Sequence, residues 1–295
     1  KIAQKEGVTL GALLTRTDYI AHGTTAATNT MVEYTGAVTG LITTKGFRDI
    51  LEFRRGYKES IFDPKLQPPP PIVPRRRRIG VEDRIDLEGN VLVSLKEEEV
   101  LEALQKFKEA GVESVAVCLL FSFLNPSHEK RIAELIEQEL PGVNISLSHE
   151  VLPEIREFER VSTTAINAYV APKLGRYLRS LENNLAGNGY RHSLLVMQSN
   201  GGVMDVDYLS RKPVHSLLSG PAGGVIGSAH LGGLADYQNF ITVDMGGTSY
   251  DVSLVQNLQP ERTTASWFSR YRLAVPMIDI HTVGAGGGSI GWVDD

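Results

Sequence analysis

ITVDMGGTSYDVSLV, residues 241–255, is the stretch that decides the fold of this chain. Two apolar runs rich in β-branched residues flank a turn with two glycines and a threonine, which predicts a β-hairpin with an exposed tip. Consecutive backbone N–H groups at such a tip bind an oxyanion, because glycine lets the backbone approach a phosphate closely. Asp244 leaves the first strand where it could hold a metal ion or orient a water, and Asp251 lies across the turn. An ordinary glycine-rich hairpin is the plainer alternative, but the full pattern favours a phosphate-binding turn.

A second glycine-rich segment strengthens this interpretation. In DIHTVGAGGGSI, residues 279–290, four of five consecutive positions are glycine. Glycine loses the most backbone entropy on ordering, so the run needs a local reason, and close approach of a flat or charged ligand supplies one. A flexible linker is the alternative. The segment is neither a dinucleotide fingerprint nor a Walker A loop, since no GxGxxG opens a helix and no Gly-Lys-Ser/Thr occurs. We expect the two bends to face each other across a shared cleft.

The composition excludes several classes of protein. The 295 residues, 42% of them hydrophobic, suffice for a large core in two domains or in one domain with a large insertion. A net charge of −5 gives no basic field for nucleic acid. The longest apolar run, residues 115–121, is far shorter than the roughly 20 residues that span a bilayer. The single cysteine, Cys118, excludes a disulfide framework and favours a cytoplasmic protein.

An α/β layer is predicted for the first half of the chain. Apolar strands at 38–43, 114–121 and 144–148 alternate with amphipathic helices at 96–110 and from Asn125 onward.

Other segments carry weaker signals. The proline-rich stretch 57–78 predicts an extended loop. Its terminal arginine run, 75–78, either binds a phosphate or a partner or, as the plainer alternative, is a solvated surface. Pro172 is expected to break or kink a long helical region. Small residues at 223, 224, 227 and 228 predict a helix packed unusually close to another backbone.

Eight motifs follow one another along the chain: HGTTAATN, TTKGFRDILE, VCLLFSFLNPSHE, SHEVLPEIREFERVSTTAINAYV, MQSNGGVM, LSGPAGGVIGSA, DMGGTSYDVSL and DIHTVGAGGGSI. In this order they resemble the hydantoinase A / 5-oxoprolinase family, which also includes acetone carboxylase β-type subunits. The match runs from about residue 17 to residue 293.

The resemblance implies the two-lobe α/β fold of actin, sugar kinases and heat-shock chaperones, in which two ribonuclease-H-like domains clasp ATP. Residues 1–158 would form the remainder of the first lobe with an α/β insertion. Residues 159–295 would form the connecting helix, phosphate hairpin and glycine loop that begin the second lobe. Members normally carry another DxGGT-type hairpin upstream of HGTT, and nothing before Thr17 supplies it. We therefore expect a fragment truncated at both ends that binds ATP weakly or not at all by itself.

For function, the resemblance implies ATP-dependent, ring-opening hydrolysis of a cyclic amide, such as a hydantoin or 5-oxoproline. Phosphorylation of the amide oxygen creates a good leaving group and lets water attack. The resemblance places Asp244 on Mg²⁺ or its water shell, with Asp251 in support. It places phosphate or nucleotide on Gly246, Gly247, Thr248, Gly284, Gly286, Gly287 and Gly288.

Histidine-containing turns supply further candidates with open alternatives. His22 either contacts substrate or the γ-phosphate, or only caps the following helix. Thr24, Thr25 and Glu150 are candidate substrate contacts. His149 with Glu150 forms either an acid/base or metal cluster or a structural ion network. His281, beside Asp279, either binds a metal or hydrogen-bonds the glycine loop.

Three rival activities share these motifs or this fold. A ketone carboxylase subunit would use ATP to carboxylate its substrate. An actin- or chaperone-like switch would use nucleotide to change shape, and a small-molecule kinase would release a phosphorylated product. The resemblance also implies a second subunit of hydantoinase B type, and neither nucleic acid nor membrane as a partner.

Overall fold

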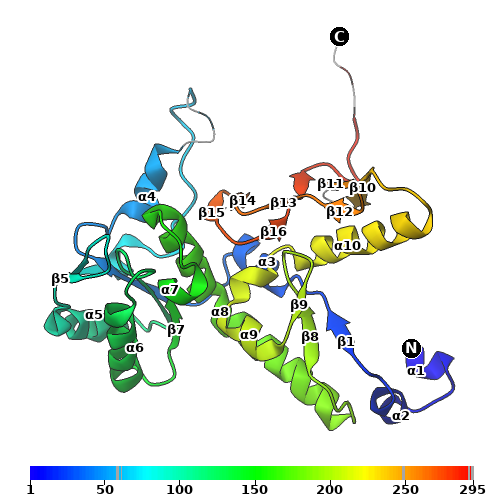
Figure 1. Ribbon diagram of the computed structural model, residues 1–295, viewed down its shortest axis with the longest axis horizontal. Helices are drawn as coiled ribbons and strands as arrows, with labels where there is room; N and C mark the ends of the chain where they lie inside the picture. The colour runs from blue at the N-terminus through cyan, green and yellow to red at the C-terminus, as the bar shows by residue number, and fades with distance from the viewer. Residues whose placement is uncertain (58–59, 61, 248–249, 292, 294–295) are drawn as a thin grey trace.

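The computed structural model describes residues 1–57, 60, 62–247, 250–291 and 293. Helix α8, Glu157–Gly187, runs through the middle of the molecule between an α/β unit on one side and the remaining sheets on the other (Figure 1). It is one continuous 31-residue helix that crosses Pro172 without a break, which corrects the expectation of an interruption there. Its first two-thirds are buried among the surrounding elements, so tertiary packing outweighs the single hydrogen bond that the proline removes.

The α/β unit contains a four-stranded parallel sheet in the order β3-β2-β6-β7. Helices α5 and α6 bury their apolar stripes with the sheet in one core cluster. Gly40 in β2 makes this packing close, because a Cβ there would lie 2.8 Å from the Phe107 ring. The elements of the unit are β2 Thr39–Thr44, α4 Ile50–Phe53, η1 Arg54–Gly56, η2 Arg75–Arg77, β3 Arg78–Val81, β4 Arg84–Ile85, β5 Val91–Val93, α5 Glu97–Glu109, β6 Ser114–Cys118, α6 Ser127–Glu139, β7 Asn144–Leu147 and α7 Ser148–Val151.

The predicted alternation of strands and helices in this unit is observed, and β4 and β5 add a short antiparallel pair. The arginine run differs from its prediction. Arg78 is fully buried and donates to Glu52 (2.9 Å), and Arg75 donates to Asp49 (2.9 Å). The run therefore fastens the proline-rich segment to α4, and only part of it is solvated.

A second sheet joins β1 and β8 in parallel, with β9 antiparallel at its edge. Because β1 and β8 lie more than 170 residues apart, both halves of the chain build this part of the fold. Its elements are α1 Ile2–Lys5, α2 Leu10–Thr15, β1 Ile20–His22, α3 Ala26–Val32, β8 Leu194–Met197, β9 Val203–Met204, α9 Val206–Arg211 and η3 Pro213–Ser216.

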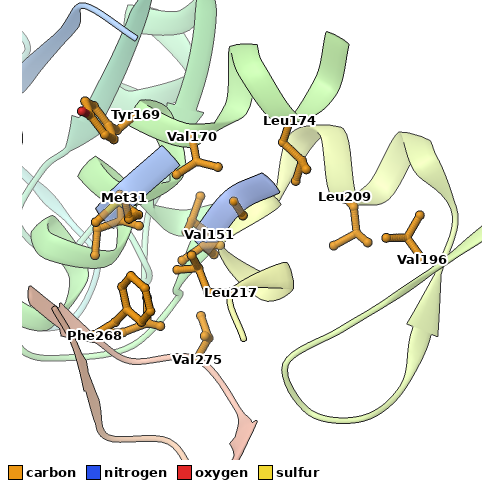
Figure 2. Close-up of a cluster of buried hydrophobic side chains, with 14 of the residues drawn as sticks. Met31, Val151, Tyr169, Val170, Leu174, Val196, Leu209, Leu217, Phe268 and Val275 are labelled. Carbon is orange, nitrogen blue, oxygen red and sulfur yellow. The ribbon is translucent and has the colours of Figure 1, made fainter. Parts of the chain in front are cut away.

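The largest core cluster gathers side chains from many elements around α8 (Figure 2). Met31 from α3, Leu174 from α8 and Leu209 from α9 meet there. Phe268 and Val275 reach the same cluster from the C-terminal part of the chain. Two short antiparallel strand pairs from this part of the chain therefore pack against the core around α8: β13 Arg262–Thr263 with β16 Met277–Ile278, and β14 Ser266–Phe268 with β15 Tyr271–Leu273.

The last sheet carries the segment from which the sequence analysis began. Helix α10, Ser219–Leu234, packs against strands β10 Phe240–Met245, β11 Tyr250–Gln256 and β12 Gln259–Pro260, and β17 His281–Val283 pairs with β11. The predicted close crossing is not observed at Gly223, Gly224 and Gly227. A Cβ at Gly224 or Gly227 would meet no atom within 4 Å, and a Cβ at Gly223 would lie 3.5 Å from the Met197 side chain. The close approach of α10 comes later in the helix, where a Cβ at Gly232 would lie 2.4 Å from the Phe240 ring.

Candidate active site in the cleft beside the phosphate hairpin

The two carboxylates of the hairpin lie directly opposite each other. Strands β10 and β11 pair with Asp244 against Asp251 and Thr242 against Ser253. These four residues share the face of the sheet that packs toward α10, since Phe240 and Val255 on the same face join the α10 core cluster. Like charges at paired positions repel each other. The arrangement therefore favours a bound cation. Thr248 lies outside the described residues, so its predicted phosphate contact remains a prediction.

The two glycine-rich bends touch each other. Gly287 N donates to Gly246 O (2.9 Å), and Gly288 N donates to Gly247 O (3.3 Å). A Cβ on Gly286 would lie 2.7 Å from Gly246 O. Position 286 therefore requires glycine, because the backbone of the hairpin tip leaves no room for a side chain. The expectation that a cleft separates the two bends is wrong, because they are in direct contact. The amides of Gly287 and Gly288 are thus already hydrogen-bonded, whereas a Cβ at Gly284 would meet no atom within 4 Å.

Strand β17 orients the second carboxylate. Thr282 Oγ1 donates to Asp251 Oδ1 (2.5 Å) across the β11–β17 pair. Ser253 Oγ donates to the carbonyl of Asp279 (2.7 Å), which fixes the approach to β17. His281 Nε2 lies 3.5 Å from Asp279 Oδ2, and its side chain is exposed. His281 therefore pairs with the carboxylate two residues before it.

A large cleft, with an empty volume of about 1800 Å³ including open solvent, brings the two halves of the chain together. One wall comes from α3, through Thr25, Thr28 and Val32. The other walls are residues 265–269, residues 279–282 with Asp251, and the first turn of α10 at Leu218, Gly220 and Pro221. The N-terminus of α10 carries no side-chain cap, and Leu218 before it adopts a left-handed conformation (φ 59°). Uncapped N–H groups at a helix start favour an anion.

A smaller groove of about 480 Å³ opens from this cleft between α10 and the hairpin. Asp251, Pro221 and Ile280 line both spaces, whereas Asp244 lines only the groove. Gly224 and Ser228 form its helical side. The small residues of α10 thus leave room for a ligand beside the carboxylates.

The HGTT turn lies at the contact between α3 and α10, and its side chains have mainly local partners. His22 Nε2 lies 2.9 Å from the Tyr177 hydroxyl, and burial lowers the pKa of His22, which keeps the ring neutral. Thr24 Oγ1 accepts from Ala26 N (3.1 Å) at the start of α3, and its carbonyl accepts from Ser219 Oγ (3.1 Å). Of the three predicted residues, Thr25 is the one that lines the cleft.

Glu150 does not line the cleft. It is exposed on α7 in the α/β unit. Its neighbour His149 contacts Glu129, with Nδ1 2.6 Å from Oε2. Glu129 is fully buried and also accepts from Leu119 N and Ser148 Oγ. The structural network that the sequence left open is therefore observed around His149, with Glu129 as its centre.

Asp244 and Asp251 fit a magnesium ion. Mg²⁺ in nucleotide sites is usually held by one or two carboxylates together with phosphates and waters. Among the described residues, no three His, Cys, Asp or Glu side chains gather as a self-sufficient metal site. The pair therefore fits an ion that arrives with phosphate ligands of its own.

Three features of the cleft were not predicted from the sequence. They are Thr28 on α3, Thr282 on β17 and the wall formed by residues 265–269. The spacing of IDIHTV indicates a strand that contains Thr282, but it does not indicate that this strand pairs with β11. The wall could not be predicted, because short hairpins such as β14–β15 have little periodicity to detect.

Comparison with known protein families gives two matches. A model described as hydantoinase/oxoprolinase N-terminal region matches residues 2–140, and a model described as hydantoinase/oxoprolinase matches residues 160–295.

Individual relatives agree with the family models. Caprolactamase subunit alpha of Pseudomonas jessenii is 38% identical over all of this chain, which covers 43% of that protein. The 5-oxoprolinase of Saccharomyces cerevisiae is 34% identical over 91% of the chain and 23% of its own length. Acetone carboxylase beta subunit of Xanthobacter autotrophicus is 28% identical over 96% of the chain and 41% of its own length. The chain thus spans less than half of these relatives.

Solved structures confirm the fold class. The crystal structure of the ATP-dependent caprolactamase from Pseudomonas jessenii matches the whole chain with a TM-score of 0.90 at 37% identity, and the chain covers 43% of it. The nucleotide-free structure of acetone carboxylase matches 96% of the chain with a TM-score of 0.85 at 28% identity, over 41% of its own length. None of the helices within the described residues combines the length and apolar character needed to cross a bilayer.

Proposed function

Because the chain belongs to the hydantoinase/oxoprolinase family, we propose that it is part of an enzyme that opens a cyclic amide by ATP-dependent hydrolysis. Caprolactamase and 5-oxoprolinase, two of its relatives, act on cyclic amides. The solved caprolactamase structure with which the chain superposes is described as ATP-dependent. The relatives are more than twice as long as this chain, so we assign turnover to the complete protein and expect weak Mg-ATP binding by these residues alone.

One observation carries the proposal. Asp244 and Asp251 are paired across the hairpin, face α10, and lie in a groove that opens into the cleft. This arrangement suits the transfer of a phosphoryl group. The carboxylates lie at the edge of a cleft, and an uncapped helix N-terminus and open glycine positions lie beside them.

The proposed chemistry has three steps. The γ-phosphoryl group of ATP moves to the carbonyl oxygen of the amide, forming an O–P bond as the bond to ADP breaks. Water then attacks the carbon and the ring C–N bond breaks, with a proton going to the nitrogen, which leaves an acyl phosphate. A second water hydrolyses this acyl phosphate to the carboxylate and inorganic phosphate. When bound, Mg²⁺ offsets the negative charge of the phosphates.

The residues of the chain have separate tasks in this scheme. Asp244 and Asp251 hold the ion or its waters, and Thr282 fixes the orientation of Asp251. The backbone at Gly246 and Gly247, the open position at Gly284 and the first turn of α10 accommodate phosphate oxygens. Thr25 and Thr28 offer hydroxyl groups to the substrate on the opposite wall.

The runner-up function is ATP-dependent carboxylation of a ketone. It is favoured by the superposition on acetone carboxylase with a TM-score of 0.85. Several relatives carry subunit names, and we propose that this protein also works with a second subunit, of hydantoinase B type, in the cytoplasm.

The complete protein with its co-purifying partner provides the test. We expect Mg-ATP to be consumed together with ring opening of a hydantoin, 5-oxoproline or a lactam, without bicarbonate. Asp244→Asn is expected to lower kcat by about 100-fold or more, as removal of single charge-stabilising groups does elsewhere. Bicarbonate-dependent ATP consumption with a ketone would establish the carboxylase instead. A soluble phosphorylated product would indicate a kinase.

A further inference from the structure

A second cavity lies beside the β14–β15 hairpin and shares no lining residue with the cleft. It has an empty volume of about 660 Å³, including open solvent. Its floor is formed by Phe158, Ser162 and Ala165 of α8, all buried. Leu51 of α4 forms one side, and the proline-rich segment covers the top at 68–72.

The covering segment suits an apolar lining. Pro68, Pro69 and Pro71 have no N–H group, so they cover a dry space without leaving a donor unsatisfied. The hairpin ties the segment down, because Tyr271 Oη donates to Pro70 O (2.5 Å) and Arg270 Nη2 donates to Gln67 O (2.7 Å). The space is thus enclosed by groups whose polar atoms already have partners.

Four charged residues line the cavity: Glu52, Arg54, Arg270 and Arg272. Arg270 donates to Gln67 O of the covering segment. Arg54, Phe158 and Arg272 line both the cavity and an adjoining shallow pocket, and so mark its mouth. Arg272 lies over the Trp267 ring at 5.5 Å, and its Nε is 4.0 Å from Glu159 Oε1. That carboxylate oxygen has a closer partner in Arg55, at 2.9 Å.

The carboxylate among the lining residues is already compensated. Glu52 accepts from the fully buried Arg78 at 2.9 Å. The electrostatic character of the mouth is therefore set by guanidinium groups, and the interior is apolar.

We propose that this cavity binds a small carboxylic acid with a compact apolar body. The body occupies the space between the prolines, Leu51 and Ala165, and the carboxylate lies at the mouth against Arg272. Arginine suits this task because its planar N–H groups match the two oxygens of a carboxylate. A nucleotide does not fit, since its phosphates and ribose would lose water to an apolar lining.

The position of the cavity links it to the active site. Residues 265–269 of the hairpin line the cleft, and residues 270–272 line the cavity. A ligand in the cavity would therefore contact the residues that directly follow this wall of the cleft in the sequence.

Calorimetric titration of this chain with cyclohexanecarboxylate tests the proposal. For a ligand of this size in an enclosed site, we expect saturable binding with a Kd of about 0.1–1 mM. The neutral analogue cyclohexanecarboxamide should bind at least about tenfold more weakly, because it gives up the charge-assisted bond.

Two variants locate the site. Leu51→Trp fills the cavity from the α4 side and is expected to abolish binding. Arg272→Gln removes the charge at the mouth and should weaken the carboxylate at least about tenfold while leaving the amide unchanged. Leu87→Trp, at an exposed position in the β4–β5 turn, is the matched control and should bind as the parent does.

Thermal unfolding of each variant establishes that it is folded before titration. No saturable binding to the folded parent would overturn the proposal. So would unchanged binding in folded Leu51→Trp, or equal affinity for the acid and the amide. If Leu51→Trp fails to fold, Arg272→Gln and the acid–amide comparison decide.

Discussion

Gly286 is the residue on which contact between the two glycine-rich bends depends. A methyl group there would press against the backbone of Gly246 and Gly247 at 2.7 Å. We expect Gly286→Ala to destabilise the chain by about 1–3 kcal/mol, as overpacking does elsewhere. Gly284→Ala is the control, because nothing lies within 4 Å of its Cβ. It should stay within about 0.5 kcal/mol of the parent. Urea unfolding measures both, and equal effects would contradict the packing argument.

Asp244 illustrates a conflict between stability and function. In buffer with a chelator, Asp244→Asn should raise stability by a few tenths of a kcal/mol, within the range of about 0.2–1 kcal/mol for relieved cross-strand repulsion. The gain is small because Asp244 is exposed. The same substitution removes a carboxylate that we propose as a ligand for Mg²⁺. A loss of stability in the variant without metal would show that the carboxylate pair is not repulsive.

His215 gives the stability of the chain a pH dependence. Burial, with a smaller effect of Lys212, lowers its pKa from 6.5 to about 4. Between these values the unfolded chain binds a proton that the folded chain does not, so stability falls as the pH is lowered from 6.5 toward 4. At about 1.4 kcal/mol per pKa unit, the loss approaches about 3 kcal/mol. Unfolding of parent and His215→Gln across this range isolates the effect, which should disappear in the variant.

At the level of single residues, the sequence identified candidate side chains of the site better than it identified the residues they contact. The pairing of Asp244 with Asp251 follows from the two-residue period of a hairpin. The bond from Thr282 to Asp251 could not be predicted, because it depends on which strand lies beside β11. Glu150 was a misleading candidate, since the buried partner of its neighbour is Glu129, twenty positions earlier.

Among the elements, α10 contains glycines, which have poor helix propensity, at positions where a side chain would have room. Gly227 meets no atom that a Cβ would contact, so Gly227→Ala should stabilise the helix by about 0.5–1 kcal/mol. Gly224 lines the groove beside the carboxylates. Gly224→Leu should place its side chain there and weaken Mg-ATP binding by the complete protein. Denaturation and calorimetry separate the two effects, and tight nucleotide binding by Gly224→Leu would place the phosphates elsewhere.

Elements with strong periodicity were predicted well. Helices α5 and α6 and strands β2, β6 and β7 lie where the apolar pattern placed them. The short strands β13 to β16 were missed, because two or three residues carry no measurable period. The small residues of α10 were correctly seen as unusual, but composition alone does not distinguish close packing from an open groove.

For the whole molecule, the outer face of β10 is the most exposed apolar surface of the last sheet. Ile241, Val243 and Met245 are 63%, 52% and 58% exposed, and β10 is an edge strand. Exposed apolar patches on edge strands promote association. We expect this chain alone to self-associate at high concentration and to bind a hydrophobic dye. Val243→Lys should reduce both effects in light scattering and dye fluorescence. Ile2→Lys, at a position in α1 that is at least as exposed, is the control and should change neither.

The overall architecture was predicted from the order of motifs. What the sequence could not supply is the path of the chain after β12. The strand pairs at 262–278 return to the core around α8 and place Phe268 and Val275 in it. Such long-range packing has no local signal, since it depends on contacts more than 100 residues apart in the chain.

The bonds from Gly287 and Gly288 to the hairpin tip have a kinetic consequence. These amides lie in an exposed loop, yet they are released only when the tip and the loop separate. In hydrogen–deuterium exchange they should slow together when phosphate occupies the tip, even though these two amides donate to the hairpin and not to the ligand. Nucleotide binding at the hairpin tip would then slow exchange at Gly287 and Gly288, because their two hydrogen bonds join the loop to the tip.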